Sequence, residues 1–133
     1  MNRIAVQTKV QATGPFIGDG VNVSTVTENA WTLVIEIINM TPSTTARFTF
    51  EDSADGFVSD ILPGPPVSVE GQIGDGSGNA AGFSPNTLRY SFTEYDFPDL
   101  RIGVSACALR LNLTRLSGNN GRPSIVYQSW IEY

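Results

Sequence analysis

Apolar and polar residues alternate along many short stretches of this chain. Alternation with a period of two is typical of β-strands that bury one face. Glycine and proline, 13 and 8 residues respectively, fall between these stretches and predict turns. The pattern predicts strands at residues 4–10, 21–27, 31–39, 46–51, 67–73, 88–93 and 124–133.

The strongest of these strands, residues 31–39, is apolar on both faces, which predicts a central strand covered from both sides. In residues 46–51 the alternation points Phe48 and Phe50 into the core. Residues 52–56 are predicted to form a turn in which Asp and Ser side chains bond nearby backbone amides. Residues 57–61 fit either a short helical turn or a short strand.

Residues 106–116 fit two periodicities. Ala106, Leu109, Leu113 and Leu116 have helical spacing, whereas Leu109, Leu111 and Leu113 would share one face of a strand. The strand is favoured, and with residues 124–133 it would form a long C-terminal hairpin around the turn at 118–121.

Many short strands separated by turns, without βαβ alternation, are typical of a sandwich or barrel. We therefore expect one domain over residues 1–133, an all-β antiparallel β-sandwich of jelly-roll or immunoglobulin-like type, with a barrel-like closure as the alternative.

Charge and cysteine content narrow the possible partners. The net charge is −5, and the 8 basic residues are scattered singly, so nucleic-acid binding is not expected. Charged residues make up only 16% of the chain, which fits either a surface covered by a partner or one rich in uncharged polar groups. The single cysteine, Cys107, lies between alanines and is predicted to be a buried thiol. Neither a signal-peptide pattern nor an apolar run long enough to span a membrane is visible, and synthesis in a cytoplasm is expected.

The sequence contains no histidine, which removes the usual catalytic triads and the commonest zinc ligand. No phosphate-binding glycine motif is present. We therefore expect no enzyme activity, no cofactor, no metal and no small-molecule substrate. Residues 75–79 space oxygen ligands as calcium loops do, but a flexible turn within the loop 74–84 is the favoured interpretation.

A hydrolase that uses only carboxylates stays open as an alternative, because glycoside hydrolysis needs just two acids across a cleft. Glu36 is its best candidate because it lies mid-strand among apolar residues, although pairing with an arginine on a neighbouring strand is favoured. Further candidates are Glu51, Glu70, Glu94 and Asp96.

Aromatic residues are the candidate interface residues, because exposed aromatic rings anchor protein interfaces and stack on sugars. Trp130 falls on the strand face opposite Ile125, Tyr127 and Ile131, so it needs cover from outside the core. A partner subunit could supply that cover. The candidates for the interface are Trp130, Tyr133, Tyr95 and Phe97. A row of exposed aromatics would instead favour a carbohydrate-binding module.

Residues 89–92, 95–101, 109–113 and 127–133 together resemble small structural proteins of tailed bacteriophages. The short, acidic, all-β chain without histidine or paired cysteines is similar in style to head decoration, or cement, proteins. The resemblance implies a virion location on the capsid surface, with the major capsid protein and copies of the chain itself as partners. A tail or adaptor component of the virion is the nearest alternative. Residues 2–10 could pair with the sheet edge of another chain.

Overall fold

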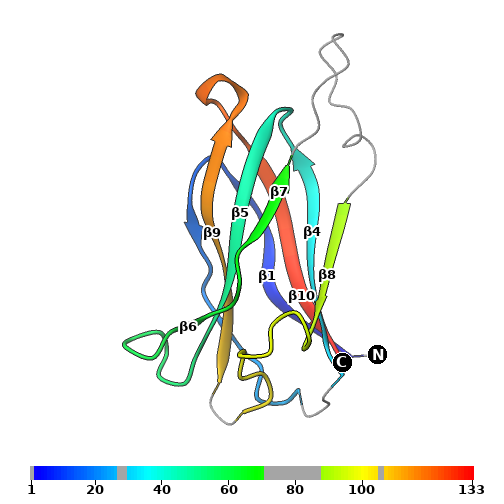
Figure 1. Cartoon of the computed structure of the whole chain (residues 1–133), viewed down its shortest axis with the longest axis vertical. Helices are drawn as coiled ribbons and strands as arrows, with labels where there is room; N and C mark the ends of the chain where they lie inside the picture. Colours follow the sequence, from blue (N-terminus) through cyan, green and yellow to red (C-terminus); the bar gives the residue numbers. More distant parts are fainter. Residues whose placement is uncertain (1, 27–29, 71–87, 105–106) are drawn as a thin grey trace.

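The computed structural model describes residues 2–26, 30–70, 88–104 and 107–133. Two antiparallel sheets face each other (Figure 1). The first sheet has the order β1 (Arg3–Ala12), β10 (Ile125–Glu132), β4 (Thr32–Met40) and β8 (Leu88–Thr93). In the second, β9 (Ala108–Gly118) and β5 (Thr44–Ser53) are central. They are flanked by β2 (Phe16–Ile17) and β3 (Val21–Asn22) on one side and by β6 (Leu62–Pro63) and β7 (Val67–Glu70) on the other.

The strand order is that of a jelly roll. β2 with β3, and β6 with β7, can each be counted as one interrupted edge strand. Each sheet then has four strands among the described residues. The chain then crosses from one sheet to the other at every connection except the one from β5 to β6. This order of two interleaved Greek keys differs from the immunoglobulin arrangement. The predicted all-β sandwich is confirmed, and the sheets do not close into a barrel.

The core lies between the two sheets and is built from the inward positions of each strand. Phe48 packs edge-on against Tyr127 across the sandwich, with ring centroids 4.9 Å apart. Phe50 packs in the same way against Phe97, at 5.7 Å. Phe48 and Phe50 point inward as predicted, and β4 is a central strand between β10 and β8. Cys107 is a free, buried thiol, also as predicted.

The predicted C-terminal hairpin is wrong, although both of its strands exist. Residues 108–118 form strand β9 and not a helix, but β9 pairs with β5, whereas β10 pairs with β1 and β4. The physical reason is that the leucine face of β9 and the apolar face of β10 cover the same core from opposite sides. The short 3-10 helix η1 (Asn119–Gly121) therefore connects β9 in one sheet to β10 in the other.

Other predicted elements are shorter than expected. Of the stretch 21–27, which is described up to residue 26, Val21–Asn22 is a strand and residues 23–26 are not. Residues 57–61 form neither helix nor strand. The stretch 67–73 is a strand over Val67–Glu70, and its remainder lies outside the described residues. The segment 2–10 pairs with β10 of its own chain, and backbone bonds between Asn2 and Tyr133 extend this pairing.

A β-bulge in β9 reverses the direction of its side chains. Leu113 pairs with Phe48, but Arg115 pairs with Arg47, so Thr114 is an extra residue between two register pairs. Strict alternation after the buried Leu113 would turn Arg115 inward. The bulge instead leaves Arg115 exposed and returns Leu116 to the core side.

The hydroxyl of Tyr127 allows a test of how one buried polar group affects the stability of the core. Its side chain is fully buried, and in the described part of the chain its hydroxyl has no hydrogen-bond partner. Removing an unsatisfied buried hydroxyl relieves its desolvation cost, so Tyr127→Phe should raise the free energy of unfolding by about 1 kcal/mol. Urea denaturation of the two proteins checks this, and a loss of more than about 1 kcal/mol would show that the hydroxyl has a partner.

Candidate interaction surface at the loop end

Most of the exposed large apolar side chains in the described part of the protein lie at one end of the sandwich. We call residues 54–61, between β5 and β6, and residues 94–104, between β8 and β9, the loop end; both segments lie at the bottom of Figure 1. Within it, the exposed fraction is 82% for Val58 and 86% for Tyr95, and Ile61 and Val104 are also exposed. Outside it, Ile17 on β2 is the other exposed large apolar residue among those described.

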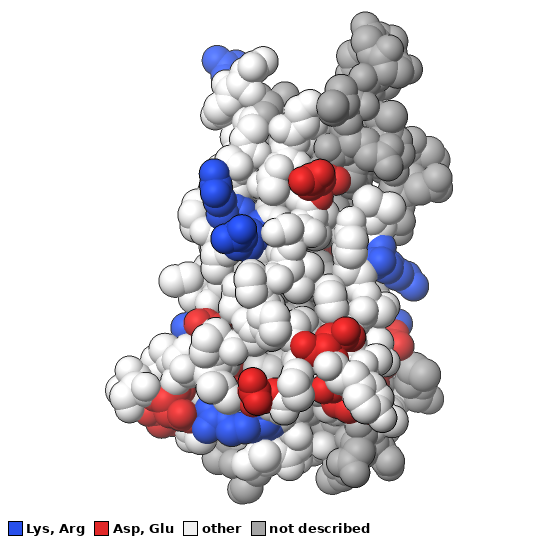
Figure 2. Space-filling model, in the orientation of Figure 1, with Lys and Arg blue, Asp and Glu red and all other residues white. Residues whose placement is uncertain are grey.

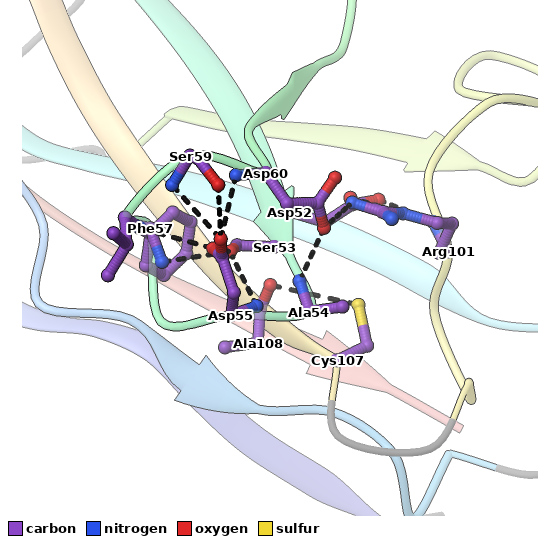
Figure 3. A network of polar contacts seen from close by, with 11 residues as sticks. Asp52, Ser53, Ala54, Asp55, Phe57, Ser59, Asp60, Arg101, Cys107 and Ala108 are labelled. Carbon is purple, nitrogen blue, oxygen red and sulfur yellow. Dashed lines mark hydrogen bonds and ion pairs between the residues drawn. The ribbon is translucent and has the colours of Figure 1, made fainter.

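Residues 54–61 are wrapped around the carboxylate of Asp55 (Figure 3). Asp55 accepts hydrogen bonds from the backbone amides of Val58, Ser59 and Asp60, at 3.0–3.1 Å. It also accepts bonds from the hydroxyls of Ser59 and Ser53, at 2.8 and 2.9 Å. These bonds, that of the Ser59 hydroxyl foremost, hold the pKa of Asp55 well below its usual range. The predicted bonding of Asp and Ser side chains to loop amides is thus confirmed for Asp55 and Ser53.

Asp52 and Arg101 connect the two segments of the loop end to each other and to the end of β5. The side chain of Asp52 is fully buried at the end of β5 and accepts hydrogen bonds from the backbone amide and the guanidinium of Arg101. Arg101 also contacts Asp60 at 2.8 Å, and Asp60 in turn accepts a bond from the amide of Ala54. Arg101, from the segment 94–104, is therefore bonded both to the end of β5 and to the segment 54–61 (Figure 3).

Phe57 anchors the same loop to the second sheet. Its backbone φ of 63° lies in the left-handed region, which is costly for a residue with a side chain. Its ring stacks on the guanidinium of Arg110, 4.0 Å from the ring centroid, and Arg110 is held by Glu51. A Cβ atom at Gly20 would lie 2.8 Å from this ring, so the glycine makes room for it.

These contacts fix the loop backbone before any partner arrives. A surface ordered in advance loses less conformational entropy on binding than a mobile one. Because Val58 is mostly exposed at the tip of this ordered loop, the arrangement suits docking into an apolar recess of another protein.

The candidate interface residues named from the sequence fall in different places. Tyr95 is exposed in the loop end. Phe97, two residues later, is 3% exposed and packs in the core, so its side chain is not available to contact a partner. Tyr133 is half-buried beside Asn2, at the end of the sandwich where both termini lie.

Trp130 lies on the outer face of the first sheet, as its strand position predicts, but its own chain covers it. The guanidinium carbon of Arg3 is 4.2 Å from the ring centroid, and that of Arg89 is 5.4 Å away. The indole nitrogen donates a 2.7 Å bond to Glu132, and Val34 on β4 is the register partner of Trp130. Only 5% of Trp130 stays exposed.

The candidate carboxylates Glu36 and Glu51 lie on opposite outer faces of the sandwich and cannot flank one bond. Glu36 is held by Arg89 and Gln128 on the first sheet, and Glu51 by Arg110 on the second. Burial would by itself raise the pKa of Glu36, but the bonds from Arg89 and Gln128 outweigh it and keep the pKa below its usual range. A carboxylate held ionised in this way does not suit the role of general acid.

Trp31, Tyr90, Tyr95 and Trp130 do not form the row of exposed aromatic rings that a sugar-binding surface needs. Trp31 and Trp130 are buried, and Tyr90 packs against the core, which leaves Tyr95 alone. The described residues contain no group of acids or cysteine that could hold a metal ion. The glycine-rich loop 74–84, with the calcium-like stretch 75–79, lies outside the described residues. The described part also has no helix that is long and apolar enough to cross a membrane.

Sequence reasoning missed the two features that define the loop end. Arg101 is one of several isolated arginines, and nothing near it in the sequence marks its bonds to Asp52. Val58 lies in a stretch that also fits a strand, so its exposure was not predictable. No family model, no curated protein and no solved structure matches this chain.

Proposed function

We propose that this chain is a non-enzymatic structural protein of a bacteriophage virion, a capsid decoration protein that stabilises the head by binding capsid subunits. The observation that carries the proposal is the pre-ordered loop end with Val58 at its tip. A protein that binds neighbouring capsid subunits and stabilises the capsid needs a rigid body and fixed apolar contact points. The jelly roll, with loops held by hydrogen bonds and ion pairs, has both.

The fold is compatible with this role but does not decide it, because jelly rolls include viral capsid domains, lectin domains and cupins. Two observations favour assembly over the other uses. The sequence has no histidine for acid–base or metal chemistry. Among the described residues, the exposed large apolar side chains are aliphatic apart from Tyr95, which suits contact with protein more than stacking on a sugar.

Exchanging one exposed side chain tests the proposal. Val58→Asp should lower the number of copies on purified particles at least about tenfold, because a charge would have to be buried at the contact. The copies are counted by mass spectrometry relative to the major capsid protein. Ile17→Asp is the matched control, since Ile17 is also exposed but lies on β2 away from the loop end.

Both variants should melt at the temperature of the unchanged protein, because neither side chain is in the core. Equal occupancy for Val58→Asp and the unchanged protein would show that the loop end makes no contact with the capsid. Recovery of the chain only with purified tails would contradict a head location.

A further inference from the structure

Arg47 and Arg115 form a pair of like charges on the outer face of the second sheet. They are direct register partners on β5 and β9, and both are exposed. In Figure 2, which looks onto this face, two basic side chains lie next to each other over these strands, while acidic side chains gather toward the loop end.

The bulge at Thr114 creates this pair. It turns Arg115 to the outer face opposite Arg47, and the Thr114 hydroxyl donates a 3.0 Å bond to the carbonyl of Arg47. Like charges directly opposite each other on neighbouring strands are destabilising. The local backbone therefore holds two guanidinium groups close together, and the repulsion between them lowers the stability of the fold.

The other arginines with a described ion pair are each matched to a carboxylate. Arg3 contacts Glu132, Arg89 contacts Glu36, Arg110 contacts Glu51, and Arg101 contacts Asp52 and Asp60. Arg47 and Arg115 have no carboxylate within ion-pair distance among the described residues. Glu70 on β7 is the register partner of Thr45, diagonal to Arg47, and forms no ion pair with it.

Two adjacent guanidinium groups bind carboxylates well, because each presents its N–H donors in a planar fork that fits the two oxygens. A negatively charged ligand would also remove the repulsion within the pair. A chain of net charge −5 repels a nucleic-acid backbone at long range, so the phosphate groups of nucleic acid are the less suitable occupants.

The chain itself carries carboxylates that suit this pair. Glu94 and Asp99 lie between β8 and β9 in the loop end, and Asp99 is exposed. Neither has a cationic partner among the described residues. They cannot reach Arg47 and Arg115 of their own molecule, because β5 and β9 carry the pair toward the opposite end of the sandwich.

We propose that Arg47 and Arg115 of one copy bind the acidic segment 94–99 of a second copy, in a head-to-tail contact between neighbouring decoration proteins. This contact rests on the proposed function. It makes a second copy of the chain one of the partners that bind the loop end. Head-to-tail contacts use two different patches and close into rings when the rotation between neighbours allows it.

Complementary charge reversals test the contact in sedimentation velocity experiments. The unchanged protein should associate at low ionic strength and dissociate when salt is raised to about 0.5 M. The variants Arg47→Glu/Arg115→Glu and Glu94→Arg/Asp99→Arg should each associate at least about tenfold more weakly. An equimolar mixture of the two variants should associate again, because the reversed loop of one then meets the reversed pair of the other.

Lys9→Glu is the control for net charge and is compared with the single variant Arg47→Glu, since Lys9 is exposed on β1 in the first sheet and has no ion pair among the described residues; it should leave association unchanged. Failure of the mixture to associate, or an unchanged protein that stays monomeric at low salt, would overturn the contact. Neither result bears on the proposed function, because occupancy on particles is measured separately by mass spectrometry.

Discussion

Asp52→Ala is expected to lower the free energy of unfolding by about 2–3 kcal/mol, at the lower end of what breaking a buried ion pair costs. Asp52 is fully buried and accepts bonds from both the backbone and the side chain of Arg101. Without the carboxylate these donors lose their partner, although Arg101 is one-third exposed and keeps Asp60. The loss corresponds to a melting temperature lower by roughly 10 °C, measurable by calorimetry.

Asp52→Asn separates charge from hydrogen bonding in this prediction. The amide oxygen can still accept the bond from the Arg101 backbone, so the asparagine variant should lose about half as much stability. If Asp52→Ala changed the free energy of unfolding by less than about 0.5 kcal/mol, the loop end would not be held by this residue.

Trp130→Ala is expected to cost about 3 kcal/mol of unfolding free energy, near the lower limit for removing a buried tryptophan. The ring lies outside the core between Arg3 and Arg89, and these long side chains can partly collapse into the space left behind. Chemical denaturation of the isolated chain measures the effect.

Trp130→Phe is the matched control, because it keeps an aromatic face for the two arginines but removes the bond to Glu132. It should cost about 1 kcal/mol. If the isolated chain lost no stability with Trp130→Ala, the packing of the ring between Arg3 and Arg89 would not stabilise the fold.

The fold class was predictable because alternation fixes which residues face the core. The inward position of Phe48 and the central place of residues 31–39 followed directly from the pattern. The pairing of strands did not follow, because an apolar face shows that a strand is covered but not which sheet it joins. The sequence therefore suggested a hairpin between residues 106–116 and 124–133, whereas the two strands lie in different sheets.

The candidate surface was only partly predictable. The exposure of Tyr95 agrees with its choice as an interface candidate, but Phe97 has the same kind of side chain two residues away and is buried. The difference comes from the turn after β8, in which the amide of Phe97 bonds to the carbonyl of Thr93. The outward position of Arg115 depends on a bulge that breaks the alternation from which positions were predicted.

A search for this chain in purified phage particles is the most direct test of the proposed role. Quantitative mass spectrometry should find the chain in purified heads at a fixed ratio to the major capsid protein. That ratio should persist through repeated gradient purification, as expected for a protein bound by specific contacts. Absence of the chain from the particles would contradict the proposal that it is a decoration protein.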